Sequence, residues 1–88
     1  PEYLMGYYQY AKIASLASSN IDDGIKHCKY YLDQDHVEGL PGKHWAYYRL
    51  GMLNQTRRDM HAAKQALENA LRVKPDFQKA RDMLDSLE

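Results

Sequence analysis

Residues 47–75 read YYRLGMLNQTRRDMHAAKQALENALRVKP, and this stretch decides the fold. Small and apolar residues stand at fixed places within it: Leu50, Gly51, Ala63, Leu67 and Ala70. Their three- and four-residue spacing is typical of amphipathic helices, here two of them separated by the polar turn at Arg57 and Arg58. Pro75 ends the second helix, because proline disfavours the helical conformation in the residue before it. The small residues indicate that the two helix backbones approach closely.

Helical spacing of apolar residues extends along the whole chain, and no stretch alternates as a strand does. We expect five helices, over residues 2–17, 21–35, 43–55, 59–73 and 76–88. A linker containing Gly39, Pro41 and Gly42 separates the second helix from the third. We expect Asn20 to cap the second helix, with Asp23 completing a capping box, and Asp76 to cap the fifth.

The chain also repeats itself with a period of 34 residues. Pairs of identical residues with this spacing include Pro41 and Pro75, Ala46 and Ala80, Leu50 and Leu84, Leu53 and Leu87. A looser repeat relates Gly24 and Cys28 to Ala63 and Leu67, with an offset of 39 residues. Such periods are typical of stacked helix pairs, in which each repeat needs its neighbours to complete a core.

The segment 43–76 resembles a tetratricopeptide repeat, whose pattern is W-x2-L-G-x2-Y, then A-x3-F, then P. Tyr47 stands where Trp is usual, and Asn54 where Tyr is usual. The resemblance implies an all-α fold, a right-handed superhelix of antiparallel helix pairs. We assign residues 1–88 to one such domain, with a degenerate first repeat over 1–36, a well-matched repeat over 43–76 and a C-terminal capping helix over 77–88. Because three or more repeats are usual, we expect a fragment of a longer protein.

The resemblance further implies a concave groove lined by the first helix of each repeat. Counted from Gly51, the groove positions of the well-matched repeat hold Trp45, Tyr48, Met52 and Gln55, and those of the first helix hold Met5, Tyr8, Lys12 and Ser15. Lys79 and Asp82 are the groove residues of the capping helix. The residues expected to bind a peptide are Tyr8, Lys12, Trp45, Tyr48, Met52, Gln55 and Lys79. Trp45 and Tyr48 would be the anchors, since a large rigid aromatic face is buried at small entropic cost.

We expect other tyrosines to pack between helices and not to line the groove. Tyr47 occupies the packing position of the repeat, and Tyr7, Tyr10 and Tyr31 are expected in the core or between repeats. Core burial is also the alternative for Trp45 and Tyr48. Some family members clamp a terminal carboxylate with Lys, Asn and Arg, but Tyr48, Met52 and Met83 stand at such positions here, so we do not expect that clamp.

Composition and motifs argue against several other classes of function. Twelve basic and twelve acidic residues balance, whereas a nucleic-acid surface needs a clustered basic excess. No apolar run approaches the roughly 20 residues of a membrane span. Cys28, the single cysteine, is expected to be buried, and His36, His44 and His61 to be solvated or capping. No phosphate loop, nucleophile elbow or HExxH motif occurs, so we expect no catalysis, cofactor or metal.

The sequence therefore predicts a non-catalytic scaffold that binds a protein or peptide in an aromatic groove. The alternative is an assembly module that joins copies of the chain or domains of a larger protein, through its tyrosine-rich surface. A third hypothesis, an accessory domain of an enzyme, requires catalytic motifs outside these residues.

Overall fold

The computed structural model of the chain describes residues 2–88. Five helices follow one another: α1 (Glu2–Ala17), α2 (Ile21–Asp33), α3 (Lys43–Thr56), α4 (Met60–Val73) and α5 (Gln78–Leu87). No strand occurs within the described range, which confirms the all-α class. The helix ends agree with the sequence prediction to within two residues, which is the usual uncertainty of such boundaries.

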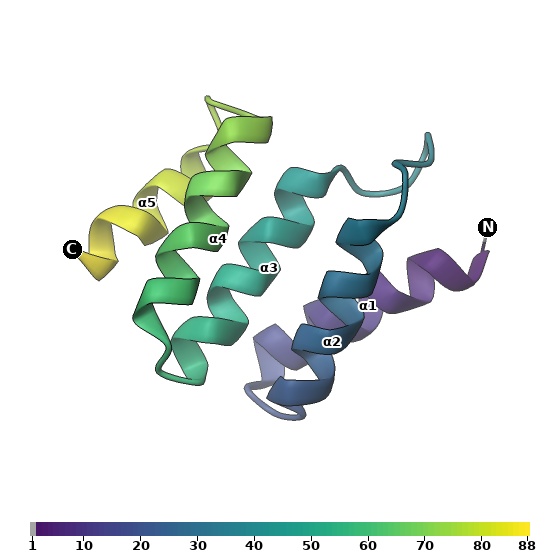
Figure 1. Cartoon of the computed structure of the whole chain (residues 1–88), viewed down its shortest axis with the longest axis horizontal. Helices are drawn as coiled ribbons and strands as arrows, with labels where there is room; N and C mark the ends of the chain where they lie inside the picture. The colour runs from purple at the N-terminus through teal and green to yellow at the C-terminus, as the bar shows by residue number, and fades with distance from the viewer. Residues whose placement is uncertain (1) are drawn as a thin grey trace.

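Each helix packs against the next one along the chain, and α1 also packs against α3. The result is a flattened body of 37 × 28 × 18 Å, with α1 and α2 toward one end of its long axis and α5 at the other (Figure 1). α3 is the central element, because it contacts α1, α2 and α4. None of the helices within residues 2–88 has the length and apolar character that crossing a bilayer requires.

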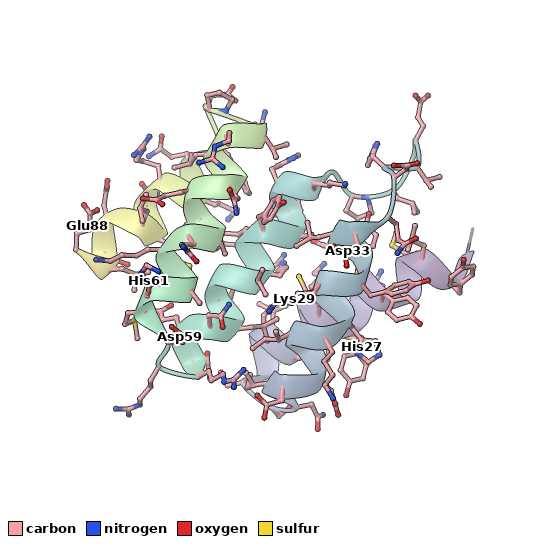
Figure 2. All side chains as sticks on the ribbon, viewed as in Figure 1. His27, Lys29, Asp33, Asp59, His61 and Glu88 are labelled. Atoms are coloured by element: carbon pink, nitrogen blue, oxygen red, sulfur yellow. The ribbon has the colours of Figure 1, made fainter. Side chains whose placement is uncertain are left out.

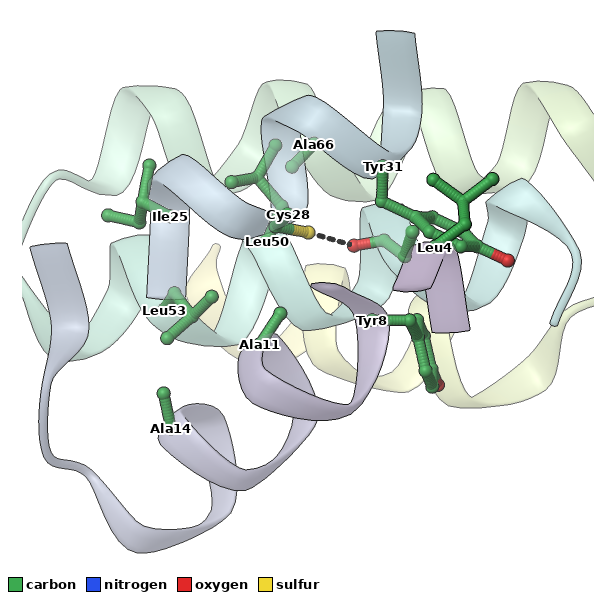
Figure 3. Packing of buried hydrophobic residues seen from close by; sticks show 11 residues of the cluster. Leu4, Tyr8, Ala11, Ala14, Ile25, Cys28, Tyr31, Leu50, Leu53 and Ala66 are labelled. Atoms are coloured by element: carbon green, nitrogen blue, oxygen red, sulfur yellow. Dashed lines mark hydrogen bonds between the residues drawn. The ribbon is translucent and has the colours of Figure 1, made fainter. Parts of the chain in front are cut away.

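Two clusters of buried residues hold the helices together. The first joins α1, α2 and α3 and includes Leu4, Ala11, Ile25, Cys28, Leu50 and Leu53 (Figure 3). The second joins α4 and α5 and consists of Leu67, Ala70, Phe77, Ala80 and Leu84. The alanines at the predicted contact positions, Ala46, Ala63, Ala70 and Ala80, have no solvent exposure at all. Small side chains therefore lie where the helices come closest.

The α3–α4 contact shows why the repeat pattern needs a glycine. A Cβ atom added to Gly51 would lie 2.8 Å from Leu67 Cδ2 and 3.6 Å from the carbonyl oxygen of Ala63. Gly24 plays the same part between α1 and α2, since its added Cβ would lie 2.8 Å from the Cβ of Ala14. The sequence prediction of close backbone approach at Gly51 is confirmed.

Both predicted helix caps are wrong, and α4 has a cap that was not predicted. Asp59 caps α4, because its Oδ1 accepts a hydrogen bond of 3.1 Å from the amide of Ala62. Asn20 precedes α2 with a left-handed backbone (φ 53°), unlike the extended conformation of most N-cap residues, and makes no side-chain cap bond. Asp76 is not a cap either: α5 begins later, at Gln78, and the Asp76 carboxylate pairs with Lys74 at 3.3 Å.

Candidate functional site

A pocket of about 470 Å³ lies where α1 and α3 meet the loop that precedes α3. Four of its lining residues come from α1, three from the loop and two from α3: Met5, Tyr8, Gln9, Lys12, Gly39, Leu40, Pro41, Trp45 and Arg49. Ligand pockets usually have volumes of roughly 300–1,000 Å³, so this one is large enough for one or two side chains of a partner.

Hydrogen bonds fix the loop wall of the pocket. The Tyr31 hydroxyl, on α2, donates to the carbonyl oxygen of Pro41 at 2.6 Å. Burial raises the pKa of Tyr31, so the hydroxyl keeps the proton that it donates. The Leu40 amide donates to the carbonyl oxygen of Val37 at 3.1 Å, and Nε2 of His36 lies 3.2 Å from the Leu40 carbonyl oxygen. These contacts give the pocket a wall formed before any ligand arrives.

Arg49 supplies the positive charge on the α3 side. The residue is only 9% exposed, and its Cζ atom lies 5.6 Å from the centre of the Trp45 ring and 5.4 Å from that of Tyr48. Nε donates to the Tyr8 hydroxyl at 3.4 Å, and one terminal nitrogen lies 3.7 Å from Met52 Sδ. Two aromatic faces therefore hold the guanidinium at the edge of the pocket.

An aromatic cluster continues from the pocket toward α5. The rings of Trp45 and Tyr48 lie 4.9 Å and 5.6 Å from the ring of Phe77, both in edge-on geometry. His44 is half-buried and contacts Phe77 edge-on at 4.9 Å, so it packs on the cluster as well as meeting solvent. Burial, and then the charge of Lys74, lower the pKa of His44 and favour its neutral form. Phe77 is almost fully buried and links α3 to the start of α5.

The structure brings part of the predicted groove together. Tyr8, Lys12 and Trp45 line the pocket, although Tyr8 is buried enough to belong to the core as well. Tyr48 and Met52 join them indirectly, through their contacts with Arg49. The other predicted residues lie elsewhere: Gln55 at the far end of α3, Lys79 exposed on α5, and Ser15 buried with its hydroxyl donating to the Lys12 carbonyl oxygen.

Sequence reasoning missed two residues that shape this surface, Arg49 and Phe77. Arg49 lies four residues after Trp45, and this spacing places two side chains on the same face of a helix. The spacing was therefore a usable signal. Phe77 gave no such signal, because it lies between two helices and its partners are on a third.

The tyrosines of α1 form a second aromatic group with α2. Tyr10 stacks on His27 at 4.1 Å, and Tyr7 packs at 4.3 Å from Tyr30. Both Tyr7 and Tyr10 are half-buried contacts between these two helices, whereas Tyr31 is fully in the core, as predicted.

Ionisable side chains elsewhere are scattered. Figure 2 labels His27, Lys29 and Asp33 on α2, Asp59 and His61 at the start of α4, and Glu88 after α5. In residues 2–88 no three His, Cys, Asp or Glu side chains lie together as a metal site would require.

The surroundings of Cys28 indicate a packing role. It is fully buried, its thiol donates to the carbonyl oxygen of Ala46 at 3.1 Å (Figure 3), and burial raises its pKa to about 12. A thiol of such pKa carries almost no thiolate at neutral pH and is a poor nucleophile.

Comparison of the chain with models of known protein families, with curated proteins and with solved structures gives no match.

Proposed function

We propose that this chain is a non-catalytic scaffold that binds a protein or peptide in the groove between α1 and α3. The observation that carries the proposal is the pocket itself, because it joins groove residues of two separate helices, Tyr8 and Lys12 on α1 and Trp45 on α3. The loop wall held by Tyr31 adds preorganisation, which lowers the entropic cost of binding.

The same proposal includes the architecture. We infer a tetratricopeptide-like stack of two helix pairs, α1–α2 and α3–α4, with α5 as the cap. Its support is the 34-residue repetition, the packing of each helix on the next, and the contact between α1 and α3, the first helices of the two pairs. In such a stack the first helices line the concave side, and the pocket between α1 and α3 is consistent with this arrangement.

The test is affinity capture from a lysate of the source cells, with the parent chain and a Trp45→Ala/Tyr48→Ala variant as baits. Circular dichroism must first show that the variant stays folded, since both rings pack on Phe77. The variant should lose partners that the parent retains. A matched control is Tyr3→Ala, because Tyr3 is 62% exposed on α1 and lies outside the pocket. Equal capture by all three baits would contradict the groove.

The second candidate function is assembly, and a separate surface favours it. Ile13 and Leu16 are 63% and 62% exposed on the last turns of α1, a large apolar exposure for a small domain. If this surface joins copies of the chain, the mass measured by light scattering should rise with concentration. Leu16→Lys should then abolish the rise, whereas Trp45→Ala should not. A mass that stays monomeric in the parent would leave only the binding scaffold.

A further inference from the structure

The Arg49 side chain is buried without a carboxylate partner. Within the described residues the ion pairs are Arg57 with Asp22 and Lys74 with Asp76, and Arg49 takes part in neither. Removing a charge from water costs several kcal/mol unless an opposite charge or strong hydrogen bonds compensate. The two donor contacts of Arg49, 3.4 Å to an oxygen and 3.7 Å to a sulfur, are longer than the roughly 2.7–2.9 Å of a charge-assisted hydrogen bond.

The aromatic neighbours of Arg49 do not supply a hydrogen-bond acceptor of opposite charge. Trp45 and Tyr48 lie 5.6 Å and 5.4 Å from its Cζ atom, and because their planes make an angle of 81°, the guanidinium can stack flat on at most one of them. A guanidinium carries five N–H groups in its plane, and the geometry suits a carboxylate that accepts two at once. Arg49 lines the pocket, so its remaining donors have a space to meet such a group.

The charge of the pocket points to an anion. Its two charged lining residues, Lys12 and Arg49, are both cationic, whereas the chain as a whole balances twelve acids against twelve bases. Glu38 is the neighbour of a loop residue but is exposed and does not line the pocket. The lining also includes the apolar side chains of Met5 and Leu40. The pocket therefore offers a ligand both positive charge and apolar surface.

We propose that this pocket takes the carboxylate of an Asp or Glu side chain in an extended peptide. Arg49 holds the carboxylate by two parallel hydrogen bonds, and Lys12 adds a second positive charge from α1. An apolar residue next to the acid packs on Trp45 and Leu40. We place the acid within the peptide and not at its end. The pocket is open to solvent between two helices and a loop, so the peptide can continue on both sides of the acidic residue. The inference rests on the proposed binding function and specifies the chemistry of its ligand.

The experiment uses Trp45, the only tryptophan of the chain, as a fluorescent reporter inside the pocket. The probe is a library of octapeptides, blocked at both ends, with Glu at the centre and varied apolar residues beside it. A twin library has Gln in place of Glu, and a third has Gln at the centre and a free terminal carboxylate. We expect the best Glu peptides to bind at least tenfold more tightly than their Gln twins, with a preference that weakens as salt is added.

Matched variants assign the preference to residues. Arg49→Met should remove it, while Lys12→Gln should reduce it severalfold. Lys26→Gln makes the same charge change at an exposed site on α2, outside the pocket, and should leave the preference unchanged. The Lys12 variant keeps the test informative if the Arg49 variant fails to fold, because Lys12 is only partly buried.

The possible results separate the two proposals. Equal binding of Glu and Gln peptides, with a change in Trp45 fluorescence, would support the proposed binding function but contradict the proposal that the pocket recognises a carboxylate. A preference for the free terminus over the internal Glu would overturn the side-chain assignment. A Glu preference that survives in folded Arg49→Met and Lys12→Gln would overturn the assigned residues. No binding by any peptide would count against the inference and the scaffold together.

Discussion

Gly51 offers the sharpest test of the packing. In Gly51→Ala the new Cβ would lie 2.8 Å from Leu67 Cδ2 and 2.9 Å from its Cγ. Carbon atoms in contact lie roughly 3.5–4.0 Å apart, so the groups must separate by about 1 Å. Leu67 is fully buried, so its side chain cannot move into solvent to relieve the contact. Overpacking of this kind costs about 1–3 kcal/mol. Replacing a helical glycine by alanine returns about 0.5–1 kcal/mol, which leaves a net loss between about 0 and 2.5 kcal/mol, with a central value of about 1 kcal/mol.

The chain contains its own control. Gly6 also lies within a helix, but it is exposed and an added Cβ would meet nothing within 4 Å. Gly6→Ala should therefore show only the favourable helix term, about 0.5–1 kcal/mol. The two substitutions are chemically identical and should shift the free energy of unfolding in opposite directions, by about 2 kcal/mol in total.

The assay is urea unfolding followed by circular dichroism. For a domain of this size a change of about 1 kcal/mol moves Tm by roughly 4–8 °C, so thermal melts give a second measure. A double-mutant cycle with Leu67→Ala adds a direct probe, because removing that side chain should relieve the overpacking and make the combined loss less than additive. Equal stabilisation by Gly51→Ala and Gly6→Ala would refute the close approach of α3 and α4.

Four further predictions concern caps and titration. Asp59→Ala should lower the free energy of unfolding by about 0.5–2 kcal/mol in urea, since it removes the cap bond to the α4 amide. Asn20→Gly should raise it, because glycine adopts the left-handed backbone more readily and no cap bond is lost. A lower stability of Asn20→Gly would contradict the absence of a cap bond at Asn20. Burial raises the pKa of Cys28 from 9.0 to about 12, so the unfolded chain releases this proton first and stability should fall as the pH rises above 9.0, by up to about 1.4 kcal/mol per pH unit. Cys28→Ala should have a smaller slope, and what remains should begin above the ordinary pKa of 10.0 of Tyr31, whose pKa burial also raises. The pKa of His44 is lowered, so stability should fall as the pH drops below 6.5 and the unfolded chain takes up the proton; an NMR titration midpoint at or above 6.5 would contradict its burial.

The fold was more predictable than the site, and particular elements show why. Helix positions follow from the spacing of apolar residues, which is a local property, and the small size of Gly51 and Ala63 was enough to indicate a close contact between two helices. Helix caps were less predictable: Asn20 has a capping side chain, but its backbone angle decides whether that side chain reaches the helix.

The pocket depends on contacts between distant parts of the chain. The resemblance to helix-pair repeats suggested Lys12 and Trp45 on separate helices, and both line the pocket. Periodicity alone could not place the loop at Leu40 against them, because the hydrogen bond from Tyr31 that holds this loop joins α2 to a segment without regular structure.

The sequence by itself determined the all-α class, the helix boundaries and the residues where helices must approach closely, because each of these follows from side-chain size and spacing along one element. Only the tertiary structure decided that Arg49 contacts two aromatic rings and lines the same pocket as Lys12 of another helix. The charge of a pocket is the sum of groups from several elements, and their distances depend on how those elements pack.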